Sequence, residues 1–101
     1  MKITALPRLR HTQRLNQPQA ERFFKAIRQW LAGANRKVAD LKNADQNRNH
    51  VDLYSSKIRR ALSEVQHHLD YLRAQGFQNE GLERELAILA ERLDQLEDRA
   101  G

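Results

Sequence analysis

The stretch that decides the fold is residues 82–96, which read LERELAILAERLDQL. Its leucines recur at alternating intervals of four and three residues, at Leu82, Leu86, Leu89, Leu93 and Leu96. An average interval of about 3.5 residues keeps the apolar stripe of a helix against a neighbouring helix along a left-handed supercoil. This part of the chain is therefore predicted to be a helix that buries one narrow face against other helices.

Two earlier stretches carry the same kind of pattern. Between residues 20 and 41 the apolar positions are Ala20, Phe24, Ile27, Leu31, Ala34, Val38 and Leu41. Between residues 51 and 72 we assign Val51, Tyr54, Ile58, Ala61 or Leu62, Val65, Leu69 and Leu72. Each stripe predicts an amphipathic helix that packs against the others.

Residues with strong preferences for helix ends set the limits of these helices. Asn16 is a good N-cap, and Gln19 follows three residues later, as in a capping box. Gly76 suits the left-handed backbone that ends a helix, and Asn79 suits the cap of the next one. We therefore predict helices over about 16–44, 51–75 and 79–99, with a polar turn at 43–49.

The predicted fold is all-α, either an up-down-up three-helix bundle or a long helical hairpin with coiled-coil-type seams. At 101 residues the chain has the size of one domain, which we place at residues 16–101. Residues 1–15 lack helical periodicity and are predicted to form a basic N-terminal arm.

Charge is distributed unevenly along the chain. Residues 1–37 hold nine Lys and Arg against one acid, whereas residues 77–101 hold three Arg against seven acids. Such asymmetry indicates either an anionic partner for the basic end or mutual attraction between the two ends of the chain.

The basic end supplies the candidate contacts with phosphates or with an acidic partner. They are Lys2, Arg8, Arg10, Arg14, Arg22, Lys25, Arg28, Arg36 and Lys37. Arginine predominates among them, which suits bidentate binding of phosphate. The alternative is that these residues only complement the acidic third helix. No zinc-finger spacing, RNA-recognition signature or convincing helix-turn-helix identifies a nucleic-acid-binding family.

The leucine seam of residues 82–96 is also a candidate surface for helix association, and it predicts a homo-oligomer, most simply a dimer. Trp30 is a candidate hot spot in a protein interface, because tryptophan is enriched at such positions, although a domain of this size can bury one.

Several other classes of function have little in the sequence to favour them. The chain has no cysteine, which excludes a disulfide scaffold and thiolate metal ligands and fits a cytoplasmic location. No Gly-rich phosphate loop or nucleophile motif predicts an enzyme, a cofactor or a small-molecule substrate. Glu64 and His67 have the spacing of a helical metal motif, but one copy is too few for a site. No apolar run reaches the roughly 20 residues of a membrane span.

Together these features predict a small non-enzymatic helical interaction protein. It would act as an adaptor or regulator of a larger protein partner through its coiled-coil-type surfaces, and it would self-associate. The alternative is a nucleic-acid-binding accessory protein whose basic arm and first helix contact phosphates.

Overall fold

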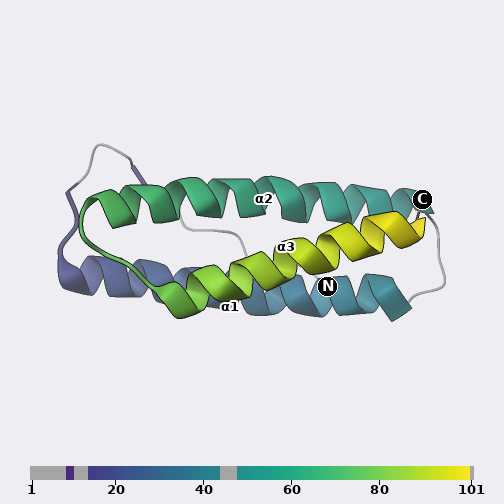
Figure 1. The fold of residues 1–101 in the computed structure, drawn as a ribbon, viewed down its shortest axis with the longest axis horizontal. Helices are drawn as coiled ribbons and strands as arrows, with labels where there is room; N and C mark the ends of the chain where they lie inside the picture. The colour runs from purple at the N-terminus through teal and green to yellow at the C-terminus, as the bar shows by residue number, and fades with distance from the viewer. Residues whose placement is uncertain (1–8, 11–13, 44–47, 101) are drawn as a thin grey trace.

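The computed structural model describes residues 9–10, 14–43 and 48–100 of the chain (Figure 1). These residues form three helices, α1 (Gln17–Asn43), α2 (Arg48–Ala74) and α3 (Glu80–Ala100). No strand occurs in these ranges, so the predicted all-α fold is confirmed. Helix α2 begins at Arg48, three residues before the predicted start. Its first turn includes the exposed polar residues Asn49 and His50, which the apolar pattern could not assign to a helix.

The three helices lie side by side in an elongated bundle of 45 × 22 × 19 Å (Figure 1). Helix α2 runs opposite to α1, and α3 returns in the direction of α1. Side-chain contacts follow these directions: Arg59 in the first half of α2 bonds Glu97 near the end of α3, and Asn35 of α1 bonds Arg92 of α3. Phe23 of α1 packs against His68 of α2, so each helix contacts both of the others.

The predicted cap of the first helix has its full hydrogen-bond pattern. The backbone N–H of Gln19 donates to Asn16 Oδ1 at 3.0 Å, and the Gln19 side chain accepts from the Asn16 N–H at 3.0 Å. These reciprocal bonds satisfy two amide groups that a helix start would otherwise leave unpaired.

The predicted end of α2 is also confirmed. Gly76 has a φ of 90°, a left-handed value that favours glycine because it has no Cβ. Phe77 N–H donates to Leu72 C=O and Gly76 N–H donates to Arg73 C=O, each at 2.9 Å. This pair of bonds is the Schellman motif, and it turns Phe77 back onto the core. Asn79 then caps α3 by accepting from the Leu82 N–H at 3.1 Å.

The core lies along the shared axis of the three helices. All five leucines of the α3 seam are buried in it, together with Trp30 and every position of the predicted α1 stripe except Phe24, which is half-buried at the edge. A smaller cluster of Leu41, Val51 and Leu96 closes the end of the bundle at which α1 leads into α2. Burial of these apolar side chains is the main source of the bundle's stability.

The core stripe of α2 differs from the predicted one at a single position. Ser55 is buried and Tyr54 is half-buried at the edge, so the stripe runs Val51, Ser55, Ile58. This order restores a strict alternation of four and three residues. The buried Ser55 Oγ has no hydrogen-bond partner in the described part of the chain, which makes it a polar interruption between the two core clusters.

The described part of the N-terminal segment rests on the bundle. Leu9 and Leu15 pack against the core, and the Leu15 N–H donates to Gln75 Oε1 at 2.8 Å. The rest of the predicted arm, residues 1–8 and 11–13, lies outside the described residues. Among the helices described, none is both long and apolar enough to cross a membrane.

Candidate functional site

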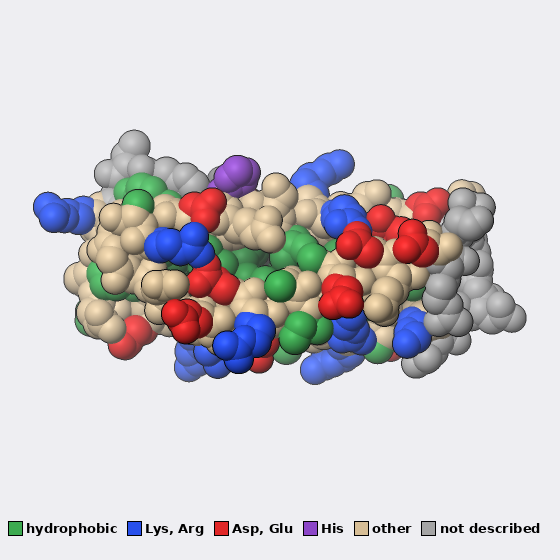
Figure 2. All heavy atoms as spheres, in the orientation of Figure 1, with side chains coloured by type: hydrophobic (Ala, Val, Ile, Leu, Met, Phe, Trp, Pro, Cys, Tyr) green, Lys and Arg blue, Asp and Glu red, His purple; other side chains and the backbone are tan. Residues whose placement is uncertain are grey.

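The outward face of α1 carries four exposed basic side chains. Arg22, Lys25, Arg28 and Arg36, here called the α1 basic face, recur at intervals of three, three and eight residues on the side away from the core. Figure 2 shows Lys and Arg side chains gathered along the edge of the molecule where α1 lies. Helical periodicity keeps these residues on one side of α1 while Ile27 and Leu31 stay buried.

These four cations have no acidic partner among the described residues. Within the described ranges, no carboxylate lies within 4.0 Å of any of them. Arg22 Nε donates to the backbone C=O of Pro18 at 3.5 Å, and Arg28 Nη2 donates to Asn79 Oδ1 at 3.4 Å. Both contacts are long and leave most of each guanidinium exposed to an external anion.

Lys37, predicted to belong with these residues, lies elsewhere. It is 7% exposed, and its Nζ lies 3.8 Å from the centroid of the Tyr54 ring on α2. Lys37 follows Trp30 by seven residues, so both face α2 from the same side of α1. Its charge is held by a cation–π contact inside the bundle, and this corrects its assignment to the exposed face.

The remaining candidates at the basic end are only partly described. Arg10 and Arg14 are exposed, whereas Lys2 and Arg8 lie outside the described residues.

Three of the seven acids of α3 are paired with arginines of α2. Arg59 donates from Nε to Glu97 at 2.8 Å and also binds Asp94. The hydrogen bonds to Glu97 and then to Asp94 raise the pKa of the Arg59 guanidinium above its ordinary value. Because Arg59 belongs to neither charged end of the chain, charge distribution along the sequence does not predict this contact.

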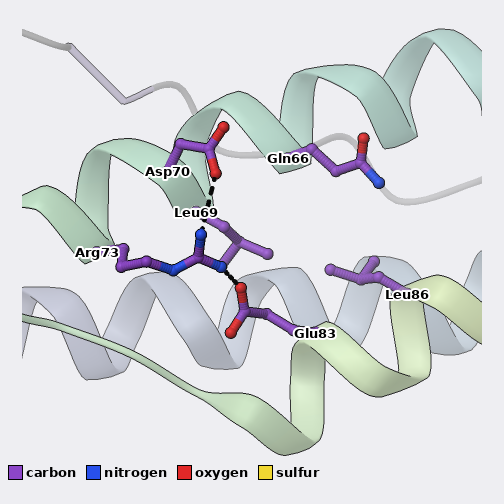
Figure 3. Close-up of a pocket in the computed structure, with 6 residues that line it drawn as sticks. All are labelled: Gln66, Leu69, Asp70, Arg73, Glu83 and Leu86. Carbon is purple, nitrogen blue, oxygen red and sulfur yellow. Dashed lines mark ion pairs between the residues drawn. The ribbon is translucent and has the colours of Figure 1, made fainter.

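A second arginine of α2 has a similar role nearer the other end of α3. Arg73 lies 3.5 Å from Asp70 on its own helix and also pairs with Glu83 of α3 (Figure 3). These three side chains surround a small open pocket above Leu69 and Leu86. Because its three charged side chains are paired with one another, the pocket is a structural contact between helices.

The boundary between α1 and α3 is built from hydrogen bonds to amides. Arg92 Nη1 donates to Asn35 Oδ1 at 2.6 Å. A shallow groove runs along this boundary and is lined by Arg28, Leu31, Ala32, Asn35, Glu85, Ile88 and Arg92. No ion pair joins α1 and α3 among the described residues, so the alternative of mutual attraction between the two ends has no direct ion pair to support it.

The other candidate surface residues are inside the bundle. The five leucines of the α3 seam are 0–7% exposed, and Trp30 is 2% exposed. They contact α1 and α2 of the same chain, so a second chain could reach them only if α3 left the bundle. Leu53 and Ile88 are the large apolar side chains that the described surface does expose.

Histidine and acidic residues do not gather into a metal site in the part of the chain that is described. Glu64 lies 3.6 Å from the buried Nε2 of His68, and His67 is exposed. The His68 ring also packs edge-on against Phe23, with ring centroids 5.4 Å apart. This histidine therefore contributes to the packing of α2 on α1.

No family model, curated protein or solved structure matches this chain. The α1 basic face and its surroundings are therefore the basis for inferring the function of this protein.

Proposed function

We propose that this protein is a small non-enzymatic accessory protein that binds nucleic acid through the α1 basic face of an up-down-up bundle. The observation that carries the proposal is the exposure of Arg22, Lys25, Arg28 and Arg36 with no carboxylate of the described chain within ion-pair distance. Cations held on one side of a helix can contact several phosphates at once, and the release of counterions then favours binding.

The composition of this face favours phosphates over an acidic protein. A protein interface has an apolar centre with aromatic or aliphatic anchors. Between the basic residues of α1 the exposed positions include Gln29 and Ala32, and α1 exposes no large apolar side chain within its described residues. Ile88 of α3 borders the groove beside this face, and it is the one large apolar side chain of that groove that is exposed.

The adaptor function predicted from the leucine seam has less support. It requires Leu82, Leu86, Leu89, Leu93 and Leu96 to be accessible to another chain, and each of them is buried within this one. Self-association through α3 would therefore compete with the folding of the monomer.

The test is the binding of the full chain to fluorescent nucleic acid, followed by anisotropy at low salt. Lys25→Gln/Arg36→Gln removes one Lys and one Arg from the α1 basic face. Lys57→Gln/Arg60→Gln is the matched control, because it removes one Lys and one Arg from exposed positions of α2. Both double variants lower the formal net charge from +5 by two, to +3.

We expect the α1 variant to weaken binding about tenfold or more and the α2 variant to weaken it less than about threefold. Equal losses in the two variants would show that net charge alone governs binding and would contradict the assignment to α1. Tighter binding to poly-L-glutamate than to nucleic acid would also contradict it, in favour of an acidic protein partner.

A further inference from the structure

We propose that the nucleic acid is double-stranded and that α1 contacts its phosphate backbone without reading its sequence. This inference rests on the proposed function and specifies the class of ligand. Three features of the described structure support it: the burial of the aromatic residues, the fixed spacing of the α1 cations, and the lining of the groove beside α1.

Proteins that bind single strands generally stack the bases on exposed aromatic side chains. The sequence contains six Phe, Tyr and Trp residues, and all six lie in the described helices or the α2–α3 turn. None of them is exposed: Trp30 is buried, and the half-buried residues are Phe23, Phe24, Tyr54, Tyr71 and Phe77. The chain therefore offers no aromatic platform on which unpaired bases could stack. Contacts with phosphates alone do not require unpaired bases.

The cations of α1 are held at fixed intervals. Helix α1 is continuous from Gln17 to Asn43, and the span from Arg22 to Arg36 covers 14 residues, or about 21 Å at 1.5 Å per residue. A duplex strand presents one phosphate per about 3.4 Å of its axis, so this span faces about six phosphates per strand. A stiff duplex already holds these phosphates in place, whereas a single strand would lose conformational freedom on binding.

The groove beside the face is a poor path for a single strand. Arg28 and Arg92 line it, but Glu85 lies in the same groove and would repel a phosphate there. Its apolar wall, Ile88, is aliphatic and has no π-face on which a base could stack.

Contacts of Lys and Arg with phosphates position a protein on a duplex without specifying its sequence. The α1 basic face presents four such cations along the outward side of a helix that packs against α2 and α3. We therefore assign these side chains to the phosphates of the duplex.

The experiment compares the full chain on one duplex, on its two separated strands, and on a second duplex of unrelated sequence. Separate DNA and RNA duplexes identify the preferred backbone, and tighter binding of either duplex than of its strands supports the inference. We expect the duplex to bind about tenfold more tightly than either strand, with the two sequences within about threefold of each other. Between about 50 and 200 mM salt, four phosphate contacts predict a loss of affinity of about 100-fold.

The two proposals fail in different ways. Equal or tighter binding of single strands, with the α1 variant still impaired, would overturn the duplex inference and leave the proposed function standing. A preference of more than about thirtyfold for one duplex sequence would likewise overturn it, because phosphate contacts alone cannot produce such a preference. No binding to any nucleic acid at low salt would overturn both.

Discussion

The side of α3 that faces α2 carries carboxylates paired with arginines, whereas the side that faces α1 carries an arginine bonded to an amide. Toward α2, Asp94 and Glu97 bind Arg59, and Glu83 binds Arg73. Toward α1, Arg92 binds Asn35. Three acids of α3 are thus paired with arginines from the nearly neutral middle of the chain, and the most basic helix keeps its exposed charges.

This difference follows from the position of each charge around α3. Asp94 and Glu97 flank the leucine stripe on the side nearest α2, and Arg92 flanks it on the other side. Opposite net charges on two helices therefore need not attract each other through direct pairs, since the register decides which residues meet. The exposed basic face of α1 is a consequence of that register.

The largest expected effect comes from breaking both sides of α3 at once. Leu89→Asp/Leu93→Asp places two carboxylates at positions that are 0% exposed, which should cost more than about 5 kcal/mol and unfold the domain. Circular dichroism should show the loss of helix and of a cooperative melting transition.

The matched control is Leu53→Asp/Ile88→Asp, which introduces the same two acids at positions 53% and 52% exposed. Its melting temperature should stay close to that of the parent. An unchanged melting curve in Leu89→Asp/Leu93→Asp would refute the burial of the α3 seam within one chain.

A smaller effect is expected on the α2 side of α3. Arg59→Gln removes the contacts with Glu97 and Asp94 and should lower the free energy of unfolding by about 1 kcal/mol in dilute buffer. This loss should shrink at about 1 M salt, because the pair is partly exposed and is screened. Arg60→Gln, one residue along and exposed, should change stability by less than about 0.5 kcal/mol.

The pH dependence of the Arg59 contact has a definite sign. Its pKa is raised in the folded state, so from neutral pH up to the unfolded pKa the contribution of the guanidinium is complete, and it is lost only as the pH rises through the folded pKa. The difference in stability between Arg59→Gln and the parent should therefore stay constant from about pH 7 to pH 10. A difference that falls within this range would contradict the assigned pair.

The smallest effect is expected on the α1 side. Asn35→Asp converts the bond with Arg92 into an ion pair like those on the α2 side, and should add up to about 0.5 kcal/mol at low salt and nothing at about 1 M salt. Repeating the substitution in an Arg92→Gln background isolates the pair in a double-mutant cycle. A coupling energy that does not respond to salt would show that position 35 and Arg92 do not form this pair, and it would contradict the contact assigned between α1 and α3.

Local sequence signals predicted much of this fold. The stripes of α1 and α3, the capping box at Asn16 and the left-handed Gly76 each depend on neighbouring residues, which the sequence displays directly. Two positions differ from the prediction for a shared reason: Ser55 takes the core position predicted for Tyr54, and Lys37, predicted as an external contact, is buried. The polarity of Ser55 and Lys37 argues against burial, which is imposed by a neighbouring helix rather than by the local sequence.

The candidate site was predictable in part for the same reason. Arg22, Lys25, Arg28 and Arg36 were expected to lie off the apolar seam, because helical periodicity fixes that much. The lack of ion pairs between these four residues and the described carboxylates of α3 could not be predicted. It depends on where Arg59 and Arg92 contact the neighbouring helices. The burial of the α3 leucines within one chain could not be predicted either, because a 3.5-residue stripe is the same in a monomeric bundle and in an oligomer.

The most direct test of the central claim is the salt dependence of duplex DNA binding by the parent, by Lys25→Gln/Arg36→Gln and by Lys57→Gln/Arg60→Gln. The slope of log K against log salt counts the phosphates that the protein neutralises, at about 0.9 per contact. We predict a slope of about −3 to −4 for the parent. The slope of the α1 variant should be smaller in magnitude by about 2, and the α2 variant should keep the parental slope. A parental slope in the α1 variant, or a reduced one in the α2 variant, would contradict the central claim.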